Sequence, residues 1–156
     1  MMENLKRGLL SAIIFALFAG VQAQAYQPDL DMDLDGFEQE ALRQKEDVWV
    51  VDFWASWCKP CIRSIPHMKK LHSKYQDQGV KFISVSWDRN EANWMNALEH
   101  FKMPWSHLIV PKGEEAWLEE QFPHRGIPTV FVIDRDGKVK KVKDVYKLDK
   151  AIYKVL

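Results

Sequence analysis

The chain has two cysteines, Cys58 and Cys61, and only Lys59 and Pro60 separate them. They follow an apolar run at 48–54 that is typical of a buried strand, and they begin a segment with helical spacing of apolar residues. A helix N-terminus offers free N–H groups and a partial positive charge, which favour a thiolate over a thiol. A second cysteine one turn later can attack a mixed disulfide formed at the first. The pattern therefore predicts thiol–disulfide exchange.

The positions of the two cysteines predict different roles for them. Cys58 begins the helix, where we expect solvent to reach it, so it is the predicted nucleophile, and Cys61 is the predicted resolving thiol. Lys59 adds a positive charge with the same effect on the thiolate, although a solvated surface lysine is the simpler interpretation. Pro60 suits the first turn of a helix, where its missing N–H costs nothing.

Three residues just before the dithiol are further candidates for the site. Asp52 interrupts the apolar run, and burial of a lone carboxylate should raise its pKa. Such a group can accept the Cys61 proton during resolution, and a structural acid bonded to backbone groups is the alternative. We expect Trp54 to pack in the core and Trp57 to form an exposed apolar rim that a partner covers.

Two other uses of a cysteine pair fit the sequence less well. A Cys-x-x-Cys ring closes a very short loop, so it removes little chain entropy and stabilises a fold poorly. A zinc site needs about four ligands, whereas the chain has two cysteines and five histidines without ligand spacing. We therefore expect no metal site and no cofactor besides the redox-active disulfide itself.

Residues 1–25 have the pattern of a secretory signal peptide. A basic pair precedes an apolar stretch at 8–21, which is short for a membrane span of roughly 20 residues, and a small-x-small pattern ends at Ala25. We expect cleavage there and a periplasmic or other extracytoplasmic location, where disulfides persist. An uncleaved membrane anchor is the alternative.

The remaining chain predicts one α/β domain. With 22 basic and 22 acidic side chains and no basic stripe, a nucleic-acid partner is not expected. We expect a loosely ordered acidic leader at 26–36 and a monomeric domain at 37–156. Apolar periodicity predicts helices at 37–44, 58–76, 92–101, 114–121 and 148–155, and strands at 48–54, 80–87, 105–110, 129–133 and 139–142. The last two strands are joined by Asp-Arg-Asp-Gly at 134–137, which is a hairpin turn signature. This order indicates a mixed sheet with the cysteines at its carboxyl edge.

Two motifs together resemble the thioredoxin superfamily. The first is Val-Asp-Phe-Trp-Ala-Ser-Trp-Cys-Lys-Pro-Cys at 51–61, and the second is Gly-Ile-Pro-Thr at 126–129. The long spacing between them adds a helix and a strand at about 89–112, and this is similar to the TlpA/ResA-like extracytoplasmic thioredoxins, also called redoxins. The resemblance implies a thioredoxin-like three-layer α/β/α sandwich with a mixed central sheet and a helix–strand insertion before the proline motif.

The resemblance also implies roles for single residues. Pro128 matches the family proline that follows a cis peptide bond and packs against the dithiol, and Ile127 would offer its backbone to a bound substrate strand. Asp52 matches the buried acid of cytosolic thioredoxins, which implies the proton-accepting role. Pro60 and Asp52 together favour a reductase, so we expect protein disulfide substrates and a membrane electron donor.

Two other functions known for this fold remain as alternatives. Peroxiredoxins carry Thr or Ser three residues ahead of the reactive cysteine, where this chain has Ala55. Copper chaperones of this fold use a longer Cys-x-x-x-Cys with a distant His. A thiol peroxidase and a non-enzymatic metallochaperone or assembly factor therefore fit the sequence less well than a thiol–disulfide oxidoreductase.

Overall fold

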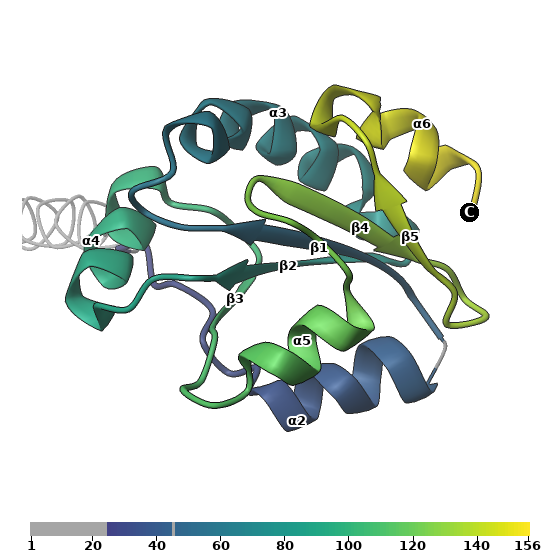
Figure 1. Cartoon of the computed structure of the whole chain (residues 1–156). Helices are drawn as coiled ribbons and strands as arrows, with labels where there is room; N and C mark the ends of the chain where they lie inside the picture. Colours follow the sequence, from purple (N-terminus) through teal and green to yellow (C-terminus); the bar gives the residue numbers. More distant parts are fainter. Residues whose placement is uncertain (1–24, 45) are drawn as a thin grey trace, which may run out of the picture.

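The computed structural model describes residues 25–44 and 46–156, so the predicted signal peptide lies almost entirely outside the described residues. The described chain forms a mixed sheet in the order β3-β2-β1-β4-β5 (Figure 1). Its first three strands pair in parallel, and β4 and β5 run antiparallel to their neighbours. The strands are β1 (Val48–Trp54), β2 (Val80–Ser86), β3 (Ser106–Ile109), β4 (Thr129–Ile133) and β5 (Val139–Val142).

Helices cover both faces of this sheet, which confirms the predicted three-layer sandwich (Figure 1). One face carries α3 (Lys59–Tyr75), α4 (Glu91–Phe101) and α6 (Leu148–Tyr153), with the 3-10 turns η2 (Gln76–Gln78) and η3 (Val145–Lys147). The other carries α2 (Leu34–Phe37), the π-helix η1 (Glu38–Gln44) and α5 (Glu115–Gln121). None of the helices within the described ranges is long and apolar enough to span a bilayer.

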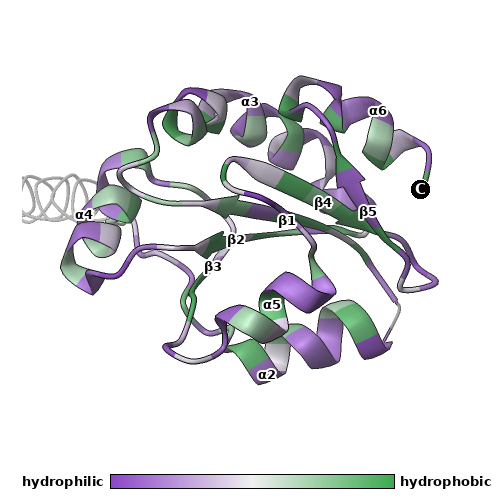
Figure 2. Cartoon of the chain, viewed as in Figure 1, coloured by the Kyte–Doolittle hydropathy of each residue, from purple (hydrophilic) through white to green (hydrophobic). Residues whose placement is uncertain are grey.

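The central strand β1 is buried along its full length because both of its faces are covered. Successive side chains of a strand point to opposite faces. Val50 and Trp54 accordingly pack in the cluster under α3, whereas Val51 and Phe53 pack with α2 and α5. This alternation places Asp52 on the α3 face. The edge strand β5 differs, because its two central residues are exposed, hydrophilic lysines between two valines (Figure 2).

Two further sequence predictions are confirmed by the strands at the edges of the sheet. The predicted insertion is present as α4 followed by β3, and β3 forms one edge. β4 and β5 form the predicted hairpin, and the Asp134 carboxylate accepts the backbone N–H groups of Asp136 at 3.1 Å and Lys138 at 2.9 Å. Gly137 takes φ 76°, a left-handed conformation that favours glycine in this turn.

The acidic leader at 26–36 differs from the expectation of loose order. Asp29 forms a parallel bridge with Ser106 at the free edge of β3, and its carboxylate accepts the Ser106 hydroxyl at 2.6 Å. The Tyr26 hydroxyl donates to the backbone carbonyl of Met103 at 2.9 Å. The leader therefore extends the sheet by backbone pairing, which does not depend on an apolar pattern in its own sequence.

The first helical segment begins inside this leader, three residues earlier than the predicted 37–44 helix. Asp33 is its N-cap, and the Asp33 carboxylate accepts the Gly36 backbone N–H at 2.7 Å. A short acidic side chain at this position satisfies one of the free N–H groups of a helix. The segment directs Phe37 into the core, where its ring lies 6.0 Å from Trp49 and 5.8 Å from Phe122.

We predict that Phe37→Ala lowers the free energy of unfolding by about 3–5 kcal/mol, because it removes a fully buried ring from an aromatic cluster. Urea unfolding monitored by circular dichroism measures this change. The control is Leu30→Ala in the same leader, whose side chain is 40% exposed; we expect about 0.5 kcal/mol or less there. Equal, small effects of both changes would mean that the first helix is not an integral part of the domain.

Candidate active site

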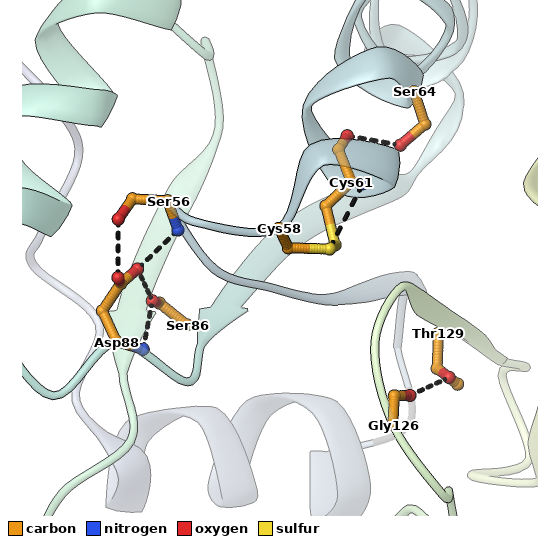
Figure 3. The surroundings of a disulfide bond; sticks show 8 residues. All are labelled: Ser56, Cys58, Cys61, Ser64, Ser86, Asp88, Gly126 and Thr129. Atoms are coloured by element: carbon orange, nitrogen blue, oxygen red, sulfur yellow. Dashed lines mark hydrogen bonds between the residues drawn. A yellow bond between two sulfur atoms is a disulfide. The ribbon is translucent and has the colours of Figure 1, made fainter.

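The dithiol lies at the junction between β1 and α3, as the sequence predicts. Cys58 is the N-cap of α3, and its Sγ accepts the backbone N–H of Cys61 at 3.3 Å. The two cysteines form a disulfide, with an S–S distance of 2.01 Å (Figure 3). Pro60 lies in the first turn of the helix. The first cysteine is thus placed where the helix end favours a thiolate once the disulfide is reduced.

Cys58 is less accessible than the sequence suggests. Its side chain is 4% exposed and that of Cys61 is 2% exposed, so the expectation that solvent freely reaches Cys58 is wrong for this oxidised form. Cys58 belongs to the same buried core cluster as Trp54 and Ala55, and its Sγ is held against the helix end by the Cys61 N–H. Trp54 is buried, as expected.

The residues around the disulfide are much more open than the cysteines themselves. Trp57 is 65% exposed, as expected, and its covering by a partner stays a prediction. Lys59 and Pro60 are also exposed on the first turn of α3. A partner that approaches the disulfide meets these side chains before it reaches sulfur.

Asp52 is buried beneath α3, on the sheet face that also carries the cysteine cluster. Burial raises the pKa of its carboxyl group to about 7, and the neighbouring Ser84 hydroxyl lowers it by a smaller amount. Ser84 pairs with Asp52 in the register of β1 and β2, and its hydroxyl accepts the indole N–H of Trp105 at 2.7 Å. A carboxyl group that titrates near neutral pH can both accept and return a proton at physiological pH.

A groove lies beside the exposed tryptophan, in the direction of the second sequence motif. It encloses about 350 Å³ and is lined by Trp57, Trp87, Glu119, His124, Arg125, Gly126 and Ile127. The structure therefore brings two predicted substrate-binding residues, Trp57 and Ile127, to one groove. Lys59 and Pro60 are not among the residues that line it.

The loop that carries Ile127 lies across from the disulfide (Figure 3). Its Ile127–Pro128 peptide bond is cis, as the resemblance implies. The Thr129 hydroxyl donates to the backbone carbonyl of Gly126 at 2.7 Å and holds the loop closed. Within the described residues, no hydrogen bond occupies the Ile127 backbone groups, so they are free to pair with an added strand.

Sequence reasoning missed one polar cluster next to the dithiol. The Asp88 carboxylate, 6% exposed, accepts hydrogen bonds from Ser56 and Ser86 (Figure 3). The only sequence signal was a polar residue directly after the predicted strand at 80–87, and such residues are common at strand ends. Trp105 and Ser84 were also missed as neighbours of Asp52.

A family model described as Thioredoxin-like matches residues 46–139, which is more than half of the chain. The chain belongs to the thioredoxin superfamily. This thioredoxin-like protein is 29% identical over 142 residues to the thiol-disulfide oxidoreductase ResA of Geobacillus thermodenitrificans, an alignment that covers 86% of this chain and 80% of the relative. It is 33% identical over 107 residues to ResA of Bacillus thuringiensis, with 69% of this chain and 60% of the relative covered.

Solved structures agree with these relatives. The thioredoxin domain of a thiol-disulfide oxidoreductase from Bacteroides vulgatus superposes with a TM-score of 0.69 at 25% identity, covering 87% of this chain and 99% of that domain. A thiol:disulfide interchange protein DsbE from Chlorobium tepidum gives a TM-score of 0.62 at 30% identity, covering 72% of this chain and 82% of that protein. The thioredoxin-like chain is therefore a ResA-like enzyme of the thiol–disulfide oxidoreductase class.

We predict that Asp52→Asn stabilises the oxidised protein increasingly as pH rises. The pKa of Asp52 is about 7 in the folded chain, above its ordinary value of 3.8. Ionisation therefore favours the unfolded chain, and wild-type stability falls between about pH 4 and pH 7. The difference should be near zero at pH 4 and reach roughly 2–4 kcal/mol at pH 8. Urea unfolding at several pH values measures it.

The control for this experiment is Asp136→Asn, which changes an exposed carboxylate in the β4–β5 turn. Its stability should follow the wild type at every pH. If the Asp52→Asn and wild-type curves ran parallel from pH 4 to pH 8, the Asp52 carboxyl group would not be the titrating group in the core.

Proposed function

We propose that this protein is an exported thiol–disulfide oxidoreductase that reduces protein disulfides. In the reduced enzyme, the Cys58 thiolate attacks one sulfur of a substrate disulfide, and the other substrate sulfur leaves as a thiolate. The Cys61 thiol then gives its proton to Asp52 and attacks the Cys58 sulfur. The second substrate sulfur leaves with the electron pair, so the substrate gains two electrons and the enzyme ends as the Cys58–Cys61 disulfide.

The observation that carries this proposal is the buried carboxyl group on the cysteine face of the sheet. Cys61 is 2% exposed, so bulk water has little access to its proton. Asp52 is buried with it on the same face, and its pKa of about 7 suits proton transfer to and from a thiol at neutral pH. A pair of cysteines that only stabilised the fold would have no need for an ionisable group that costs stability.

The same geometry supports a protein disulfide as the substrate. The disulfide is nearly covered, whereas Trp57 beside it is 65% exposed and lines a groove with Ile127. An extended substrate segment can lie in this groove, bury the indole and pair with the free backbone of Ile127. Contact with a peptide chain, in addition to its sulfur atoms, supports a protein substrate.

A reductase in an oxidising compartment must be reduced again after each turnover. We therefore propose that a membrane protein supplies the electrons across the membrane and that the signal at 1–25 exports this domain as a monomer. The names of the relatives, thiol-disulfide oxidoreductase and thiol:disulfide interchange protein, support exchange between two protein partners.

We predict that Cys61→Ser traps mixed disulfides, because the resolving thiol is absent while the nucleophile remains. The reduced variant, incubated with insulin, should gain the mass of one insulin molecule through a single mixed disulfide at Cys58. Dithiothreitol should remove this adduct. Cys58→Ser should form no such adduct and should lose insulin reductase activity by at least about 100-fold, because it lacks the attacking thiolate.

The matched comparison is between these two serine variants, which differ only in which thiol remains. Non-reducing electrophoresis and intact mass spectrometry measure the adducts. Adducts at Cys61 in the Cys58→Ser protein, formed as fast as those at Cys58, would contradict the assigned order of attack.

A further inference from the structure

The turn that leads into the dithiol, residues 55–58, is held from one side by a single carboxylate. Asp88 Oδ2 accepts the backbone N–H of Ser56 at 2.8 Å, and Asp88 Oδ1 accepts the Ser56 hydroxyl at 2.6 Å (Figure 3). Inside the turn, the Cys58 N–H donates to the Ala55 carbonyl at 3.0 Å, and Cys58 itself accepts from the α3 backbone, at Sγ from Cys61 and at its carbonyl from Ile62. Among the described residues, Asp88 is the one hydrogen-bond partner of residues 55–57 that lies outside the turn. Asp88 is therefore the tether between this turn and the rest of the fold.

The tether is itself held in place. The Ser86 hydroxyl donates to Asp88 Oδ2 at 2.7 Å, and the Asp88 backbone N–H donates to the Ser86 hydroxyl oxygen at 3.0 Å. Ser86 is the last residue of β2 and lies opposite Trp54 in the register with β1. The Asp88 side chain is thus fixed to the end of the sheet, and it is 6% exposed, so water does not compete strongly for these hydrogen bonds.

The tether joins the two aromatic residues of the groove. Trp57 follows Ser56 in the chain, Trp87 precedes Asp88, and both indoles line the groove beside the disulfide. The backbone N–H of Trp87 also donates to the carbonyl of Trp54 at 2.9 Å, so Trp87 is already fixed to the sheet. The position of Trp57 relative to Trp87 then depends on the hydrogen bonds from Ser56 to Asp88.

We propose that Asp88 is a positioning residue, which through Ser56 sets the separation of Trp57 and Trp87 and so determines how a protein disulfide docks beside Cys58. This proposal rests on the proposed function for its substrate, but the tether, meaning the two hydrogen bonds from Ser56 to Asp88, is present in the free enzyme. A purely structural aspartate would change global stability when replaced. A positioning residue changes the local order of the turn and the binding of large substrates.

The first test is amide hydrogen exchange in Asp88→Ala and Asp88→Asn. The Ser56 amide should exchange roughly tenfold faster or more in Asp88→Ala, because it loses a hydrogen bond to a charged acceptor. Asn keeps one acceptor oxygen, so Asp88→Asn should show a smaller increase, and it serves in the event that Asp88→Ala does not fold. Wild-type exchange at Ser56 in the variants would overturn the proposal.

The matched control is Asp134→Asn. The Asp134 carboxylate also holds a turn, through the backbone N–H groups of Asp136 and Lys138, but this turn joins β4 and β5 away from the dithiol. Its replacement should speed exchange in its own turn and leave Ser56 unchanged. Faster exchange at Ser56 in Asp134→Asn would mean that global stability, and not the hydrogen bonds to Asp88, sets the exchange rate of the turn.

The second test compares a large and a small substrate. In Asp88→Asn, KM for insulin should rise about tenfold, and kcat should stay within about twofold of wild type. The substitution weakens the hydrogen bonds that order the groove for binding, but it does not change the groups that react with the substrate sulfur. The kcat/KM for hydroxyethyl disulfide, which is too small to need both groove walls, should stay within about twofold. Equal losses on both substrates would overturn the docking role. If wild type does not reduce insulin, the proposed function fails. The exchange rate of the Ser56 amide then decides by itself whether Asp88 orders the turn.

Discussion

The packing of α3 against the sheet face that holds Asp52 is the constraint on which the rest of this site depends. This contact buries Cys61 and the carboxyl group on one face of the sheet, and these are the two groups to which we assign the proton transfer of the proposed resolving step. Burial disfavours the charged form of a carboxyl group, and it raises the pKa of Asp52 to about 7. The same packing directs the N-terminus of α3 outwards at the end of β1, where Cys58 is the N-cap.

The open end of the sheet is organised around that junction. The dithiol turn, the β2 end with Asp88, and the loop before β4 with its cis Pro128 meet at the carboxyl edge of the sheet. Open α/β sheets carry their sites at this edge, because the loops that leave neighbouring strands converge there. The result is a nearly covered disulfide beside a groove with exposed walls, which suits transfer between macromolecules better than reaction with a small free oxidant.

The sequence was sufficient for features that depend on local pattern. Cysteine spacing placed Cys58 and Cys61 at the helix start, and the apolar residues on both sides of Asp52 predicted a buried acid. The Asp-Arg-Asp-Gly signature at 134–137 predicted the hairpin. Each of these follows from residues within one element or one turn, where period and propensity act directly.

Features that depend on contacts between distant segments could not be read in the same way. The leader around Asp29 pairs through its backbone with Ser106, a partner far along the chain, and leaves no apolar period. Ser56 and Asp88 are 32 residues apart, so no local sequence pattern predicts the hydrogen bond between them. The low exposure of Cys58 accompanies its membership of a core cluster whose other residues come from several distant segments, which the local sequence does not specify.

The reduction potential of the Cys58–Cys61 pair decides whether this protein reduces disulfides in its partners or donates disulfides to them. The domain is equilibrated in thiol–disulfide buffers, and its free thiols are counted by mass after alkylation. For the proposed reductase we expect a value below about −230 mV, which is the range of a reductase that needs a dedicated electron supply. A value above about −180 mV would contradict it and indicate a protein that donates disulfides.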